Sequence, residues 1–311
     1  MIVPVYRSAP ILPSLVARLE PVLRSCAPAF ELVLVDDSSP DESWRVIGEL
    51  ARAHPWVRGM CMMRNFGQHG ALLCGIRTAR YDVTLTMDDD LQHPPEEIPR
   101  LVAELARGFD VVYGSPRTET HGFLRGLASR MTKLALSQAM GVATARRASA
   151  FRAFRTNLRE AFSGYGSGFV SIDVLLTWGT TRFSSVEVRH DPRAGGVSGY
   201  SVGKLLTHAL NMLTGYSAKP LQIASLTGFV FTLFGLFVLG FVLYRYVTEG
   251  GSVPGFPFLA SVIVIFSGAQ LFALGIMGEY LARIHFRMMS RPAYAVRAST
   301  EDSSPEQAVD A

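Results

Sequence analysis

Two groups of aspartates follow apolar runs of the kind that form buried strands. Asp36 and Asp37 come directly after ELVLV, and Asp88, Asp89 and Asp90 follow DVTLTM. Adjacent carboxylates repel one another, and no Lys or Arg lies within several residues of the triplet. Because Mg²⁺ and Mn²⁺ prefer oxygen ligands, the triplet predicts a divalent-cation site. A helix cap or a solvated turn is the alternative, particularly for the first pair.

The elements that must position these acids alternate between strand and helix. Strand-like runs cover residues 1–6, 31–37, 57–63, 82–90 and 109–115, and apolar residues at helical spacing mark 13–25, 41–53, 70–79 and 95–107. This order predicts an α/β fold in which a mostly parallel sheet carries helices on both faces. Ligands of such sheets bind beyond the carboxyl ends of the strands, which is where both groups of aspartates are expected.

Two stretches near the C-terminus are long and apolar enough to cross a membrane. Residues 220–244 carry no charge, and neither do residues 250–278. A bilayer core of about 30 Å needs about 20 helical residues, so the sequence predicts a two-helix transmembrane hairpin over residues 220–282. Two helices buried in a soluble core are the alternative. The positive-inside rule places both ends of the chain in the cytoplasm, because basic residues flank the hairpin: Arg193, Lys204, Lys219, Arg283, Arg287, Arg291 and Arg297.

Composition narrows the class of protein further. The chain has 311 residues, of which 49% are hydrophobic and 18% charged, and only three scattered cysteines. These values exclude a disordered chain and a disulfide scaffold. The N-terminus has no basic segment leading into an apolar one, so no signal peptide is expected. We predict a soluble domain over 1–202, an interfacial amphipathic helix over 203–219, the hairpin over 220–282, and a basic flank with a disordered tail over 283–311.

The segment DDDLQHPPEEIPRL resembles the signature of family 2 glycosyltransferases of the polyprenyl-phosphate type. The similarity extends to PVY, VDDSSPDES, RNFGQHGA, RAGGVSGY and GEYLARIHFRMMSRPAY, so it covers nearly the whole chain. Dolichol-phosphate mannosyltransferase, bactoprenol glucosyltransferase and undecaprenyl-phosphate aminoarabinose-type transferases belong to this group. The resemblance implies a GT-A fold and a metal-dependent, inverting transfer of a sugar from a nucleotide diphosphate, preferably UDP, to polyprenyl (undecaprenyl) phosphate.

The same resemblance implies the cofactor and the partners. Mg²⁺ or Mn²⁺ is the expected cofactor, and the partners are a nucleotide sugar, a polyprenyl phosphate lipid and the membrane, with no nucleic acid. A multi-pass protein of the inner (cytoplasmic) membrane is expected, with its catalytic domain and both termini in the cytoplasm. Relatives of this type can assemble through their membrane helices, so a homo-oligomer is compatible with the resemblance.

Individual residues take roles by matching the family's motifs. The nucleotide-binding residues implied in this way are Pro4, Tyr6, Asp36, Asp37, Arg64 and Asp89. The implied metal ligands are Asp88, Asp90 and Gln92. The residues that match those holding the acceptor phosphate are Arg117, Arg125, Ser129, Arg193, Ser198 and Tyr200. The catalytic set implied by the resemblance is Asp88, Asp90, Arg117 and Arg125.

This sequence departs from the family at two positions. Relatives carry an aspartate about six residues before an FRA element, where this chain has Arg146. At the second position, Gly199 replaces a lysine of the family, and Lys204 could make the phosphate contact of that lysine instead. An alcohol acceptor would need a general base, whereas a phosphate is already anionic at neutral pH. The missing aspartate therefore weakens an alcohol acceptor more than a lipid phosphate. It also keeps two alternatives open: a catalytically inactive membrane-anchored nucleotide-binding or scaffold protein, and a processive polysaccharide synthase, although no QxxRW element is present.

Overall fold

The computed structural model describes residues 1–116, 147–166, 170–191, 219–249, 255–289 and 292–301. The chain divides into two compact units. One consists of Met1–Leu206 together with Ser290–Ala311, and the other is Thr207–Met289. The first unit contains a large sheet and its covering helices, and the second contains two long apolar helices.

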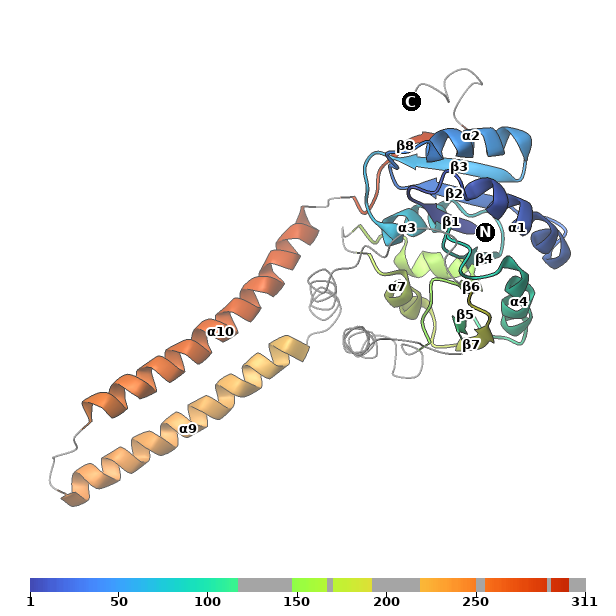
Figure 1. The fold of residues 1–311 in the computed structure, drawn as a ribbon. Coiled ribbons are helices and arrows are strands. Elements are labelled where there is room, and N and C mark those ends of the chain that lie inside the picture. Colours follow the sequence, from blue (N-terminus) through green and yellow to red (C-terminus); the bar gives the residue numbers. More distant parts are fainter. Residues whose placement is uncertain (117–146, 167–169, 192–218, 250–254, 290–291, 302–311) are drawn as a thin grey trace. The chain divides into compact units, whose positions relative to one another are not determined.

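An eight-stranded sheet forms the centre of the first unit, in the order β7-β5-β6-β4-β1-β2-β3-β8 (Figure 1). Its strands are β1 (Ile2–Val5), β2 (Leu32–Asp36), β3 (Val57–Met62), β4 (Val83–Thr86), β5 (Val111–Pro116), β6 (Arg152–Arg155), β7 (Phe183–Val188) and β8 (Val296–Ser299). Strands β4, β1, β2 and β3 run parallel, as do β5 and β7, while β6 and β8 are antiparallel to their neighbours. The central strands β1 and β2 are buried along their whole length, as expected for strands covered on both faces.

Helices cover both faces of this sheet (Figure 1). Helix α1 contacts α2 and α4 on one face, and α3 packs with α7 and the 3-10 segment η2 on the other. The bounds are α1 (Leu12–Cys26), α2 (Ser43–Ala53), α3 (Gln68–Thr78), η1 (Pro95–Glu97), α4 (Ile98–Ala106), η2 (Thr156–Phe162) and α7 (Ile172–Gly179). The α1 residues Leu12, Leu15, Val16, Leu19 and Leu23 are buried at helical spacing. The predicted mostly parallel sheet between two helical layers is confirmed.

Strand β8 was not expected from the sequence. Its residues fall in the stretch 283–311, for which we predicted a basic flank and a disordered tail, but Val296–Ser299 pairs antiparallel with β3. Beyond the strand, Thr300 N donates to Gly59 O at 3.0 Å, and Gly59 N donates to Thr300 Oγ1 at 3.0 Å. The disordered tail was predicted for STEDSSPEQAVDA, and it is wrong for residues 299–301, because they pair with a strand far away in the chain.

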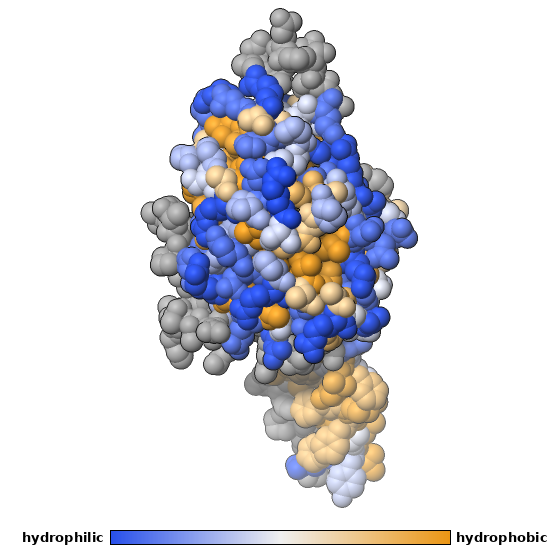
Figure 2. All heavy atoms as spheres, turned by 90° about the vertical axis from the view of Figure 1, so that its right-hand side faces the viewer, coloured by the Kyte–Doolittle hydropathy of each residue, from blue (hydrophilic) through white to orange (hydrophobic). Residues whose placement is uncertain are grey.

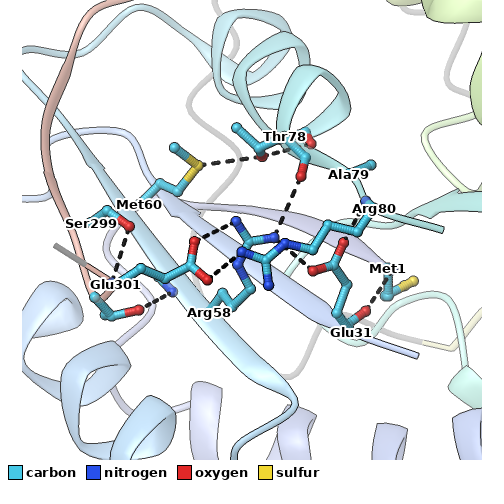
Figure 3. Close-up of polar contacts among 12 residues, drawn as sticks. Met1, Glu31, Arg58, Met60, Thr78, Ala79, Arg80, Ser299 and Glu301 are labelled. Atoms are coloured by element: carbon cyan, nitrogen blue, oxygen red, sulfur yellow. Dashed lines mark hydrogen bonds and ion pairs between the residues drawn. The ribbon is translucent and has the colours of Figure 1, made fainter. Parts of the chain in front are cut away.

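A network of charged side chains holds this C-terminal segment against the sheet (Figure 3). Arg58 on β3 donates to Glu31 at 2.6 Å and to Glu301 at 2.7 Å, and Arg80 donates to Glu301 at 2.5 Å. The side chain of Arg58 is only 12% exposed, so its ion pairs are less screened than ordinary surface pairs. We call Glu31, Arg58, Arg80 and Glu301 the C-terminal charge cluster.

The second unit consists of α9 (Lys219–Glu249) and α10 (Phe256–Met288), which pack against each other with Phe231 edge-on to Phe266 at 5.6 Å. The stretches Leu221–Arg245 and Ile265–Ala282 are long and apolar enough to cross a membrane, and none of either window is buried. In Figure 2, the part of the helix pair that can be seen is mainly hydrophobic, while the visible face of the sheet unit is mainly hydrophilic. The alternative of two buried core helices is therefore wrong, and the apolar helix pair is as predicted.

Candidate active site

A pocket opens at the carboxyl ends of β1, β2 and β4. It has a volume of about 240 Å³ and is lined by Pro4, Val5, Tyr6, Asp37, Asn65, Gly67, Gln68, Asp88, Asp89 and Asp90. These strands are parallel neighbours, so their carboxyl ends lie at one edge of the sheet. The fold thus brings the aspartate triplet, one member of the first aspartate pair and the PVY segment into one cavity.

The loops around this pocket contain strained backbone. Among the described residues, the non-glycine residues with positive φ are Arg7 (59°), Ser38 (54°) and Leu91 (58°). Each lies a few residues after β1, β2 or β4, at the edge where the pocket opens. Such left-handed conformations cost about 1–3 kcal/mol each and occur preferentially at functional sites. The sharp turns therefore point to a site whose shape is maintained at a cost in stability.

The three aspartates of the triplet accept hydrogen bonds from three different segments of the chain. Asp89 Oδ2 accepts hydrogen bonds from Ser8 Oγ at 2.5 Å and from Tyr6 N at 3.3 Å. Asp88 Oδ1 accepts one from Gln68 Nε2 at 2.5 Å. Asp90 Oδ1 accepts one from the backbone N–H of Gln92 at 3.1 Å. Burial raises the pKa of Asp89, and the hydrogen bond from Ser8 offsets only part of that effect.

The first aspartate pair is divided between the pocket and the interior. Both oxygens of Asp37 accept backbone hydrogen bonds, from Phe66 at 2.7 Å and from Gly67 at 2.8 Å. Gly67 has a φ of 84° and immediately precedes α3, so Asp37 fixes the loop that leads into this helix. Asp36 is 1% exposed, contacts Ser39 N and Cys61 Sγ, and is not among the pocket residues. Burial raises the pKa of both carboxyls.

Other predicted site residues lie outside the pocket lining. Arg64 is exposed and places its guanidinium over the Phe66 ring at 4.3 Å. Gln92 contacts the aspartate triplet through its backbone N–H, which donates to Asp90. Sequence reasoning missed Asn65, Gly67 and Gln68, which do line the pocket. The signal was present in RNFGQHGA, where two amide side chains flank a glycine just before a helix.

The donor set of the pocket suits a divalent cation. Asp88 and Asp90 offer carboxylate oxygens, which Mg²⁺ and Mn²⁺ prefer. Within the described ranges, no three His, Cys, Asp or Glu side chains form a group that could hold a metal ion alone. Mg²⁺ is usually bound through one or two carboxylates plus substrate phosphates. The residues present therefore fit a cation that is shared with a phosphate-bearing ligand.

The predicted acceptor residues Arg117, Arg125, Ser129, Arg193, Ser198 and Tyr200, together with Arg146, lie outside the described residues. The strands that lead into their segments are described. Strands β5 and β7 are parallel and end together, with Pro116 opposite Val188. Because β6 is antiparallel to both β4 and β5, the carboxyl ends of β4, β5 and β7 lie at the same edge of the sheet. Both acceptor segments thus begin at the edge that carries the aspartate triplet.

Comparisons with known proteins agree with this fold. The family model described as Glycosyl transferase family 2 matches residues 1–164. The undecaprenyl-phosphate 4-deoxy-4-formamido-L-arabinose transferase of Pseudomonas paraeruginosa is 35% identical over 299 residues, which cover 95% of this chain and 88% of that protein. The protein with the same name from Shewanella sediminis is 35% identical, over 96% of this chain and 91% of its own length.

Solved structures show the same fold at much lower sequence identity. Glucosyl-3-phosphoglycerate synthase from Mycobacterium tuberculosis, in complex with phosphoglyceric acid, superposes with a TM-score of 0.53 at 17% identity, covering 70% of this chain and 79% of that one. The protein described here belongs to glycosyltransferase family 2. The predicted family and enzyme class are confirmed, as is the GT-A type of fold.

Proposed function

We propose that this protein transfers a sugar from a nucleotide-diphosphate sugar, preferably a UDP-sugar, to undecaprenyl phosphate or a similar polyprenyl phosphate. The observation that carries the proposal is the pocket at the carboxyl edge of the sheet, in which Asp88, Asp89 and Asp90 lie beside Tyr6 and Asp37. Support for the acceptor comes from relatives whose names specify undecaprenyl phosphate and that align with nearly the whole chain.

On the donor side, the chain's own residues orient the acids. The Gln68 amide holds one oxygen of Asp88, and Ser8 ties Asp89 to the end of β1. Tyr6 is 43% exposed at the pocket and offers a ring face on which a nucleotide base could stack. A divalent cation bound by Asp88 and Asp90, Mg²⁺ or Mn²⁺, would supply positive charge to the departing diphosphate. GT-A structures of the M. tuberculosis synthase with Mn²⁺ and UDP agree with this choice of ligands.

On the acceptor side, a phosphate monoester attacks without help from a base. Its second pKa is about 6, so it is an anionic nucleophile at neutral pH. The bond from the anomeric carbon to the acceptor phosphate oxygen forms as the bond to the nucleotide diphosphate breaks, and a single displacement inverts the anomeric configuration. This chemistry tolerates Arg146 in place of the family aspartate. Arg117, Arg125 and Arg193 are proposed to hold the phosphate, because guanidinium groups bind its oxygens in pairs.

The chain connectivity supports placing the catalytic unit on one side of the membrane. Strand β7 precedes the helix pair and β8 follows it, and both belong to the same sheet. If α9 and α10 each cross the bilayer, the hairpin must begin and end on the side of that sheet. The basic residues on both flanks favour the cytoplasmic side of the inner membrane.

The test is a donor screen with the purified full-length protein, undecaprenyl phosphate and Mg²⁺ or Mn²⁺. Each labelled nucleotide sugar is offered in turn, and the lipid product is identified by mass. We expect one sugar to be added per lipid phosphate, with loss of the product when EDTA is added. A folded protein that yields no lipid product with any nucleotide sugar would overturn the proposal, and a polymeric product would favour a processive synthase.

A further inference from the structure

The loop after the aspartate triplet carries a buried histidine with no assigned role. His93 is 8% exposed, and its Nδ1 has no hydrogen-bond partner among the described residues. Its ring stacks on Phe151 at 5.3 Å with an interplanar angle of 28°. The edge of the His190 ring meets it at 5.0 Å, at an angle of 62°. Among the described residues, His93 is therefore held by aromatic contacts of its ring and not by a hydrogen bond at Nδ1.

A backbone hydrogen bond joins the same two segments. Asp191 N donates to Gln92 O at 2.8 Å, one residue away from the contact between the two histidines. An ion pair between Arg189 and Asp191 at 3.1 Å braces the second segment. The loop at residues 92–93 and the end of β7 at residues 190–191 are thus connected by both main-chain and side-chain contacts.

The two segments lead to opposite sides of the proposed reaction. Residues 92–93 follow the aspartates Asp88–Asp90 after a single leucine, and residues 190–191 come just before Arg193 in the predicted acceptor segment. Among the described strands, β7 is at the edge of the sheet and pairs with β5 alone. The contacts with residues 92–93 therefore add a second attachment for its carboxyl end, and this attachment is to the loop of the aspartate triplet.

We propose that Gln92, His93, His190 and Asp191 form an acceptor latch, in which His93 is a positioning residue that sets the acceptor segment relative to the aspartate triplet. This inference rests on the proposed function, because it assigns the acceptor side of that reaction to the segment after β7. The latch acts through distance: a displacement of about 1 Å between reacting groups can reduce a rate about 100-fold.

The test compares variants of the full-length protein in lipid transfer and in binding of UDP with Mn²⁺. For His93→Ala and for His190→Ala, we expect kcat/KM toward undecaprenyl phosphate to fall about 10–100-fold, while the KM for the donor and the affinity for UDP with Mn²⁺ stay within about twofold of wild type. The double variant should lose little more than either single one, since both act through one contact. His93→Phe keeps a ring at this position and should restore most of the lost transfer.

His54→Ala is the matched control, because His54 makes the same kind of edge contact, with Trp56 at 5.6 Å and 62°, at the start of β3. It should leave transfer unchanged. Because His190 is exposed, its variant should fold even if His93→Ala does not. Unchanged acceptor kinetics in His190→Ala, or an equal loss of UDP and Mn²⁺ binding in His93→Ala, would overturn the latch. Absence of transfer by the wild type would instead overturn the proposed function.

Discussion

Acidic side chains gather in two regions of this protein, and the two clusters are stabilised by different partners. In the C-terminal charge cluster, Glu31 and Glu301 are paired with Arg58 and Arg80. In the pocket, the hydrogen-bond donors to Asp37 and Asp89 among the described residues are a serine hydroxyl and backbone N–H groups, all neutral. Among the described residues, the acids of the C-terminal charge cluster are therefore paired with arginines, whereas Asp37 and Asp89 are held by neutral donors.

The pKa directions differ in the same way. Burial opposes ionisation of Glu301, but its hydrogen bonds and charge interactions with Arg58 and Arg80 outweigh it and lower its pKa. Burial raises the pKa of Asp89, and its neutral donors do not compensate. Acids paired with arginines hold elements together, whereas a buried acid such as Asp89, held by neutral donors, is typical of a site that binds a ligand. We therefore assign stability to the first region and chemistry to the second.

Removing a pocket carboxylate should have the largest effect on activity. For Asp90→Asn we expect transfer to fall by about 100–1,000-fold or more, since the proposed cation that would neutralise the leaving diphosphate loses a carboxylate ligand. The melting temperature should stay the same or rise, because one of three adjacent like charges is removed. Activity on undecaprenyl phosphate and thermal unfolding are measured together. Asp82→Asn, an exposed acid at the opposite end of β4, is the control and should transfer normally.

Crowding the β3–β8 edge should instead reduce stability. A Cβ at Gly59 would lie 2.4 Å from Ile47 Cγ2 and 2.8 Å from Thr300 Cγ2. Gly59→Ala should therefore destabilise the protein by about 1–3 kcal/mol, measured by denaturant unfolding, with little change in transfer per folded molecule. Gly48→Ala is the matched control: it has open space around it within α2 and should be neutral or stabilising. Equal losses in the two variants would contradict the role of this edge.

Neutralising Glu301 should have a smaller effect that depends on pH. A carboxyl whose pKa is lower in the folded state stabilises the fold above its unfolded pKa, and that stability is lost as pH falls through the folded value. Glu301→Gln should therefore lower the melting temperature at pH 7, and the difference from wild type should shrink as the pH falls below the ordinary glutamate pKa of 4.5 and vanish below the lower folded-state pKa. A difference that persists unchanged in acid would show that the ion pairs are not its source.

The sequence predicted the helices and strands whose residues follow a local periodic pattern. The spacing of Leu15, Val16, Leu19 and Leu23 indicated α1, and the apolar runs before Asp36 and Asp88 indicated strands with acids at one edge. These signals work because burial imposes a period on nearby residues. The predicted edge is the one at which the pocket opens.

Features created by distant contacts were not predictable in this way. Strand β8 has a short, partly polar sequence, and it is a strand only because β3 offers a free edge. Gln68 reaches Asp88 because Asp37 fixes the preceding loop, whereas Arg64, predicted from its match to a family motif, stacks on Phe66. Pairings between residues so far apart in the chain leave no periodic trace in the sequence.

Cys61 can report on the boundary between the two regions, and its response should be the smallest effect. It faces Ala298 across β3 and β8, and its thiol contacts Asp36 at 3.7 Å. Burial is the main reason that its pKa is raised to about 12, so the thiol stays protonated and should react very slowly with iodoacetamide at pH 8. Glu301→Gln should accelerate that alkylation, because β8 opens more often once its ion pairs are lost. Cys74 is also buried with a pKa of about 12, but it lies on α3 and reaches the β8-paired strand only through its Sγ contact with Met60 at 3.8 Å, so its rate should change less. If both thiols react faster to the same extent, the variant has destabilised the whole sheet, and the C-terminal charge cluster does not stabilise the β3–β8 pairing locally.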